Sequence, residues 1–144
     1  MRGNGIKVEG LEELKLDLSR FTDKMSDDVA EVVQETAAGI EAGVKLRMQQ
    51  GPHTGRTYKR RTVAHRASAP GEAPAPDTGA LMDSIYHQRT GKYSGVAGSR
   101  MAYSAHLEFG TFKMAPRPAW RPELKDASKD FNTALDAVLR KHTL

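Results

Sequence analysis

The stretch that decides the fold runs from Ser26 to Gln50 and reads SDDVAEVVQETAAGIEAGVKLRMQQ. Its apolar side chains recur at helical spacing and form one stripe, which consists of Val29, Val33, Ile40, Val44 and Met48. Ser26 before two aspartates is a typical helix start, and Gly51-Pro52 is a typical helix end. At 1.5 Å per residue this helix is about 37 Å long. A rod of that length with one apolar stripe needs a partner, which we expect to be the protein's own sheet rather than a neighbouring subunit.

A strand and a shorter helix are predicted on the N-terminal side of this stretch. Residues 5–9 alternate apolar and polar side chains, as a short strand does, and Gly10 ends the alternation. Leu11, Leu14, Leu18 and Phe21 then follow at helical spacing. A weak joint at residues 22–25 separates this helix from the longer one. We expect the strand to lie on an edge of the sheet.

A basic segment without a clear period follows the long helix. Residues 51–80 include the Pro/Ala-rich run 69–76, which cannot continue a helix or an inner strand. The net charge is −3 over residues 1–50, +5 over residues 51–100 and +2 over residues 101–144, so the positive excess is local. Its main contributors in this segment are Arg56, Lys59, Arg60, Arg61 and Arg66. We expect a long mobile basic loop at about residues 51–80 that becomes ordered on assembly.

The remainder of the chain predicts a hairpin and two helices. Residues 84–90 and 93–99 read as strands joined by a tight turn at Gly91-Lys92, and residues 80–82 suit one helical turn. Residues 102–109 suit a short helix that Gly110 ends, and Pro122 suits the first residue of a last helix. The predicted fold class is therefore α+β in one domain, residues 1–144. A long N-terminal helical segment and a C-terminal helix pack on a small antiparallel sheet, which consists of the hairpin and the edge strand.

Several kinds of chemistry find no support in the sequence. The chain has no cysteine, which excludes disulfides and thiolate metal sites. His106-Leu107-Glu108 resembles the first half of a zinc deaminase signature, but the paired cysteines of the second half are missing. Neither a His-Glu-x-x-His nor a phosphate-binding glycine motif occurs. We predict no catalytic residues, no metal and no cofactor, and hence no enzyme. No secretory signal and no membrane span are expected either.

Two segments together resemble a known protein family. The first, residues 68–85, contains Ala-Pro-Gly-Glu-Ala-Pro followed by Asp77-Thr78-Gly79. The second, residues 103–124, contains Leu-Glu-Phe-Gly-Thr followed by Met-Ala-Pro-Arg-Pro and Arg-Pro. This pattern resembles the "putative tail-component" family of siphophages and prophages, which are small tail-completion or head–tail joining proteins. One departure is Ala119, since the family usually has a large apolar residue after Arg-Pro; here Trp120 comes next.

The resemblance implies a structural protein of the virion, assembled in the host cytoplasm. Such a subunit would form a closed ring, expected to be a hexamer, around the DNA channel at the neck or the top of the tail. It would contact itself and neighbouring neck and tail proteins. The predicted intersubunit contact is the Pro/Arg-rich segment, namely Glu108, Phe109, Gly110, Thr111, Phe112, Met114, Pro116, Arg117, Pro118, Trp120, Arg121 and Pro122.

Elementary chemistry is compatible with a contact in this segment. Prolines reduce the entropy lost on docking, apolar side chains offer anchors, and arginines bind carboxylates in a bidentate manner. For Glu108 two further interpretations remain open: a solvated helix residue, or an ion pair with Arg117 or Arg121. The basic residues 56–66 face either the lumen, where contact with passing DNA would be independent of sequence, or an acidic neighbouring ring. The alternative function is a monomeric nucleic-acid-binding module that uses the basic 56–66 loop.

Overall fold

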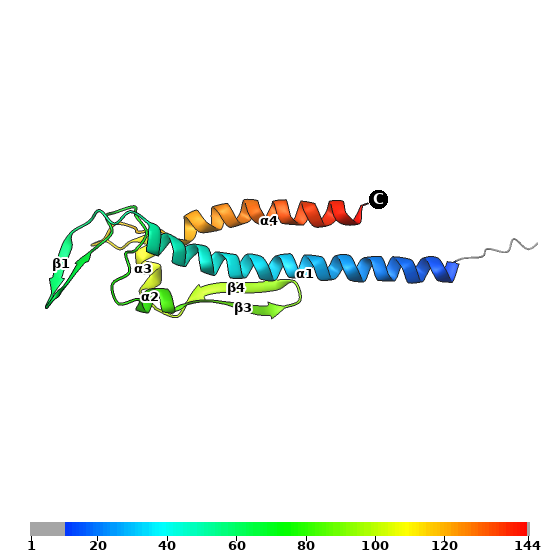
Figure 1. The fold of residues 1–144 in the computed structure, drawn as a ribbon, viewed down its shortest axis with the longest axis horizontal. Coiled ribbons are helices and arrows are strands. Elements are labelled where there is room, and N and C mark those ends of the chain that lie inside the picture. Colours follow the sequence, from blue (N-terminus) through cyan, green and yellow to red (C-terminus); the bar gives the residue numbers. More distant parts are fainter. Residues whose placement is uncertain (1–10, 144) are drawn as a thin grey trace, which may run out of the picture.

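The computed structural model describes residues 11–143 of the 144-residue chain (Figure 1). Its helices are α1 (Leu11–Gln50), α2 (Ala80–Asp83), α3 (Ser104–Phe109) and α4 (Trp120–His142). Its strands are β1 (Thr57–Arg60), β2 (Val63–Arg66), β3 (Ile85–Gly91) and β4 (Ser94–Ser99). The predicted α+β class is confirmed. The strand predicted at residues 5–9 lies outside the described residues.

Helix α1 is a single element, and the predicted joint at residues 22–25 is wrong. Thr22 donates its hydroxyl to the Leu18 carbonyl oxygen at 2.8 Å, one helical turn earlier, so it continues the helix. The Ser26 hydroxyl bonds to the Tyr93 hydroxyl and does not cap a new helix. The polar residues that suggest a break are therefore used by the helix itself and by the neighbouring hairpin.

Helix α1 is the middle of three layers (Figure 1). Helix α4 runs antiparallel along one side of α1, and the β3–β4 hairpin lies along the opposite side. The expected packing of the long helix on the protein's own hairpin is thus confirmed. The core is small and lies near the C-terminal end of α1, where Val44 and Met48 meet Ile85 and Ala119.

Within residues 11–143 the strands form two separate antiparallel pairs, whereas the sequence predicts one sheet. The β3–β4 hairpin agrees with the prediction, and its register runs from Ile85 opposite Ser99 to Gly91 opposite Ser94. The β1–β2 hairpin lies within the segment for which no regular structure was predicted, and that prediction is wrong. Seven of its eight strand residues are exposed and the eighth is half-buried, so it has no buried face to impose an alternating apolar pattern.

The C-terminal helix begins at Trp120, two residues before the predicted start at Pro122. Pro122 still lies in the first turn, where its missing N–H is tolerated. Among the described residues, none of the helices combines the length and apolar character needed to cross a membrane.

Candidate oligomer interface

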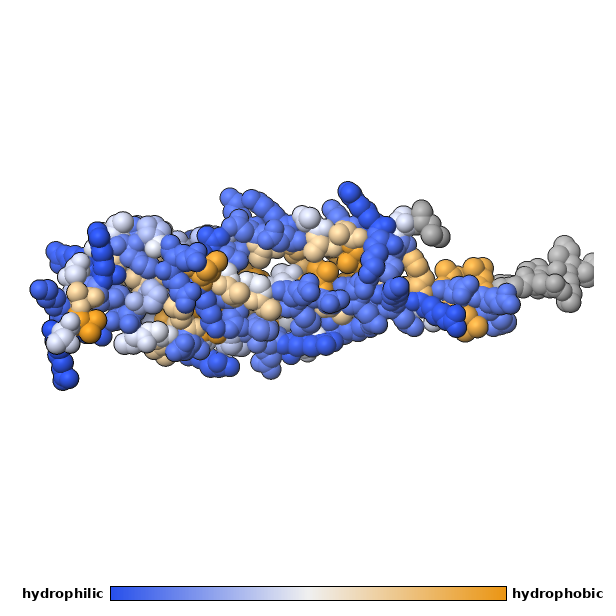
Figure 2. Space-filling view, in the orientation of Figure 1, coloured by the Kyte–Doolittle hydropathy of each residue, from blue (hydrophilic) through white to orange (hydrophobic). Residues whose placement is uncertain are grey.

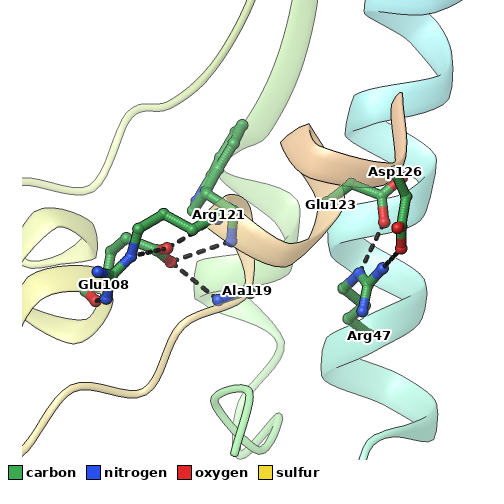
Figure 3. Close-up of polar contacts among 7 residues, drawn as sticks. Arg47, Glu108, Ala119, Arg121, Glu123 and Asp126 are labelled. Carbon is green, nitrogen blue, oxygen red and sulfur yellow. Dashed lines mark hydrogen bonds and ion pairs between the residues drawn. The ribbon is translucent and has the colours of Figure 1, made fainter. Parts of the chain in front are cut away.

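The buried carboxylate of Glu108 organises the start of α4. Its Oε2 accepts hydrogen bonds from the backbone N–H groups of Ala119 at 2.8 Å and Trp120 at 3.0 Å, and its Oε1 accepts the N–H of Arg121 at 2.8 Å (Figure 3). Glu108 belongs to α3 and is only 4 % exposed. The first N–H groups of a helix have no partner within the helix, and Ala119 has no side chain that accepts a bond. Glu108 therefore caps α4 from a distant part of the sequence.

Arg121 completes this cap. Its Nε lies 3.2 Å from Glu108 Oε1, and its Nη2 donates to the Glu108 carbonyl oxygen at 2.8 Å. The guanidinium also lies 5.3 Å from the ring centroid of Phe109. Burial acts to raise the pKa of Glu108, but the N–H donors of Trp120, Arg121 and Ala119 outweigh it and lower the pKa below the ordinary value. Glu108 is therefore an ionised cap that is paired with Arg121, and the solvated interpretation is wrong.

A closed turn follows α3. The backbone N–H of Thr111 donates to the Met114 carbonyl oxygen at 2.8 Å, and the N–H of Met114 donates back to Thr111 at 3.2 Å. Gly110 enters this turn with a φ of 75°, where a Cβ atom would lie 2.8 Å from the Met114 carbonyl oxygen and 2.9 Å from Pro116 Cδ. Only glycine fits both constraints.

The segment after the turn is tied to the body of the protein. The Pro116 carbonyl oxygen accepts the N–H of Gly71 at 2.9 Å, and the N–H of Arg117 donates to Leu107 at 2.6 Å. Arg117 Nε donates to the Ser68 carbonyl oxygen at 3.3 Å. The two motif segments of the sequence, residues 68–85 and 103–124, are therefore hydrogen-bonded neighbours.

The turn presents an aromatic side chain to solvent. Phe112 is 95 % exposed, and Phe109 at the end of α3 is 67 % exposed. Lys113 Nζ lies 5.3 Å from the Phe112 ring centroid. A shallow groove of about 460 Å³ adjoins Phe109 and is lined mainly by small and apolar side chains of β4, α3, α4 and the loop between β4 and α3, among them Met101 of that loop and Leu124 of α4. An exposed aromatic on a fixed turn is a typical anchor for a protein contact, because little entropy is lost when it docks.

The predicted interface residues divide into three groups by burial. Glu108 is buried inside the subunit, so its carboxylate is not available to a neighbour, and we remove it from the candidate interface. Half-buried members are Gly110, Met114, Arg117, Pro118, Trp120 and Pro122, and exposed members are Phe109, Thr111, Phe112, Pro116 and Arg121. Trp120 packs against the core. The candidate interface is therefore the exposed group, with Phe112 at its tip.

The five predicted basic residues are all exposed and lie on or next to the β1–β2 hairpin, which projects from one end of the molecule (Figure 1). Arg60 pairs with Asp77 at 2.9 Å, and His65 Nδ1 lies 3.9 Å from the same carboxylate. Cross-strand pairing places Arg60 and His65 on one face of the hairpin. The opposite face carries Lys59 and Arg66 as diagonal neighbours. The hairpin thus has one face turned toward Asp77 and one basic face. Arg56 lies immediately before β1.

The chain exposes more surface than a folded monomer of its size. Its accessible surface is 10614 Å², against about 7,300 Å² expected for 15.8 kDa. Ten residues of average mass expose at most about 1,600 Å², so an excess of about 2,000 Å² belongs to the described residues 11–143. That excess is comparable to what a subunit loses to two neighbours at about 800 Å² each.

Residues 11–143 contain no group of three or more histidine, aspartate or glutamate side chains arranged to hold a metal ion. The sequence motif His106-Leu107-Glu108 has a structural explanation instead, because the Glu108 carboxylate is occupied by the start of α4.

Searches of protein-family models, of curated proteins and of solved structures found no match to this chain. The resemblance to the tail-component family therefore rests on the sequence motifs alone.

Proposed function

We propose that this protein is a structural subunit of a tailed-phage virion. In this proposal it assembles into a homo-oligomeric ring, expected to be a hexamer, that completes the tail or joins it to the head around the DNA channel. The observation that carries the oligomeric part is the exposed Phe112 on a fixed turn, in a chain with an excess of exposed surface. The sequence motifs carry the assignment to the neck or tail.

Ring closure requires two different patches on each subunit, because each subunit meets its neighbours in a head-to-tail manner. The turn 111–114 supplies one patch with Phe112 as anchor. Phe109, whose ring centroid lies 5.3 Å from the Arg121 guanidinium, is a second exposed aromatic at the end of α3. The exposed leucines near the N-terminal end of α1, Leu14, Leu16 and Leu18, supply apolar area for the other patch. The prolines at positions 116, 118 and 122 hold the segment in one conformation before docking.

Removal of the Phe112 side chain tests the oligomeric part. Because Phe112 is almost fully exposed, Phe112→Ala should leave the fold intact and dissociate the ring, as measured by light scattering and electron microscopy. Leu139→Ala is a matched control, since Leu139 is an apolar side chain on α4 that is 46 % exposed. A phage with this protein deleted should produce heads and tails that do not join. Normal infectious particles from such a deletion would refute the virion role.

The second candidate function is sequence-independent binding of nucleic acid by the β1–β2 hairpin. The observation that favours it is the basic face on which Lys59 and Arg66 are diagonal neighbours, on the opposite side of the hairpin from Asp77. Lys59→Gln with Arg66→Gln should then abolish a gel shift of the isolated protein. Arg60→Gln is the matched control, because Arg60 is already paired. A shift that is insensitive to salt would contradict binding through phosphates.

A further inference from the structure

A hollow lies between α1 and α4, in the middle of their contact. Its volume is about 260 Å³, and Figure 2 shows an opening between the two helices. A Cβ atom added to Gly39 in this region would meet no atom within 4 Å. The apolar lining consists of Val32, Ala127, Phe131 and Ala134. Two packed helices of one subunit normally leave no such space.

Carboxylates also line this hollow. Glu35 comes from α1 and Asp130 from α4, and both are exposed. Within residues 11–143 neither forms an ion pair, whereas Glu123 at the same hollow is bound to Arg47 Nε at 2.7 Å. The hollow therefore combines an apolar interior with two carboxylates that are not neutralised by the described part of the chain. An arginine side chain matches this combination, because its stem is apolar and its head is cationic.

The chain carries such a side chain at the tip of the β1–β2 hairpin. Arg61 occupies the turn between the strands with a φ of 50°, which glycine and asparagine adopt readily and arginine rarely. Its neighbour Arg60 is held by Asp77. Tyr58 and Val63 are 52 % and 64 % exposed on the same hairpin, so the hairpin offers apolar area as well as charge. A two-stranded hairpin without a packed face is marginally stable in water, which favours a docked state.

We propose that the tip of the β1–β2 hairpin of one subunit enters the α1–α4 hollow of a second copy, with Arg61 between Glu35 and Asp130. The inference rests on the proposed homo-oligomer and names one of its contacts. The hairpin projects at one end of the molecule (Figure 1), whereas the hollow is lined by residues around the middle of α4. The contact joins two different patches of the subunit and is therefore head-to-tail. This is the geometry that closes a ring. Nucleic acid would use the Lys59 and Arg66 face and would have no use for an apolar hollow.

Disulfide cross-linking tests the contact, because the protein has no native cysteine. One chain carries Thr62→Cys, next to Arg61, and a second carries Ala134→Cys, inside the hollow; both substitutions keep every charge. Oxidation of the mixture should yield a heterodimer of the two chains. A chain with both substitutions should yield a ladder of covalent oligomers. Ser128→Cys replaces Ala134→Cys in the control, since Ser128 is exposed on α4 but does not line the hollow.

The charges should control the cross-link. Arg61→Asn suits the turn and removes the cation, and Glu35→Gln with Asp130→Asn removes both anions. Each change should reduce the yield at least about tenfold, because one partner of a docked charge pair is left alone. Equal cross-linking at Ser128→Cys, or a yield unaffected by Arg61→Asn, would overturn the proposal.

The oligomer itself is measured separately, by light scattering of the unmodified protein. If the unmodified protein forms rings but the cross-link does not form, this contact is wrong and the proposed function is unaffected. If the unmodified protein is monomeric and the cross-link does not form, both the contact and the proposed ring are wrong. DNA binding by the hairpin without the cross-link would assign the hairpin to nucleic acid.

Discussion

Replacement of Glu108 by glutamine removes the cap of α4 with almost no change of shape. The two carboxylate oxygens accept the N–H groups of Ala119, Trp120 and Arg121 and the Nε–H of Arg121. A glutamine side chain has one acceptor oxygen, and its NH₂ group would face two of these donors. Glu108→Gln therefore leaves N–H groups at the helix start without an acceptor, whichever way the amide is oriented.

The expected loss of stability follows from these contacts. A buried polar group without its partner costs about 1–3 kcal/mol, and loss of a helix N-cap costs about 0.5–2 kcal/mol. The interaction of the negative charge with the positive end of the helix stabilises the fold by a further amount, at most about 2 kcal/mol in a partly buried site. These contributions overlap, so we expect Glu108→Gln to lower the free energy of unfolding by about 3 kcal/mol. That corresponds to a decrease in Tm of about 10 °C for a domain of this size.

The assay is urea and thermal unfolding followed by circular dichroism at pH 7. Both proteins carry Phe112→Ala, so that assembly does not contribute to the apparent stability. Glu31→Gln is the matched control, since Glu31 is an exposed glutamate of α1, and it should change stability by less than about 0.5 kcal/mol. A loss below about 1 kcal/mol for Glu108→Gln would refute the role of this carboxylate as the cap.

The pH dependence provides an independent check. The pKa of Glu108 is lowered in the folded state from an ordinary value of 4.5, so the folded state binds its proton more weakly than the unfolded state. Its contribution to stability is therefore fully present above pH 4.5 and is lost as the pH falls through the lowered pKa. The difference between wild type and Glu108→Gln should be constant from pH 7 to about pH 5.5 and should decrease below that. A difference that grows in acid would contradict the assignment.

Three further predictions concern other positions. Gly39→Ala should raise the free energy of unfolding by about 1 kcal/mol in urea denaturation, because the added methyl meets open space and glycine disfavours a helix. Gly43→Ala should not raise it, since its methyl would overlap the Glu123 carboxylate. Gly110→Ala should lower stability by about 2 kcal/mol in the same assay, because of its φ of 75° and the nearby Met114 carbonyl oxygen. Glu72 accepts hydrogen bonds from Thr54 and from the backbone N–H of Ala69. Together these bonds lower the pKa of Glu72 to about 2, and the Thr54 hydroxyl contributes most. Glu72→Gln should therefore accelerate proteolysis of residues 51–72 at pH 7, whereas the wild type should keep its protection down to about pH 3.

The sequence alone determined the elements whose signal is local. The apolar stripe of residues 26–50, the end at Gly51-Pro52 and the 84–99 hairpin were all predictable, because each depends on side-chain period or turn chemistry within a few residues. Local signals are misleading at residues 22–25, because Ser26 resembles a helix start but bonds to Tyr93 instead. The β1–β2 hairpin gives no local signal, since its exposed strands carry no alternating pattern.

The roles of the motif residues depend on long-range packing. The sequence places Glu108 in the predicted intersubunit segment and leaves an ion pair with Arg117 or Arg121 open. The structure places it inside the subunit as the cap of a helix that begins twelve residues later, at Trp120. Likewise, the hollow between α1 and α4 depends on Glu35 and Asp130, which lie far apart in the chain. Side-chain period and turn chemistry act over a few residues, whereas a cap, a hollow or an exposed anchor depends on which distant segments the fold brings together.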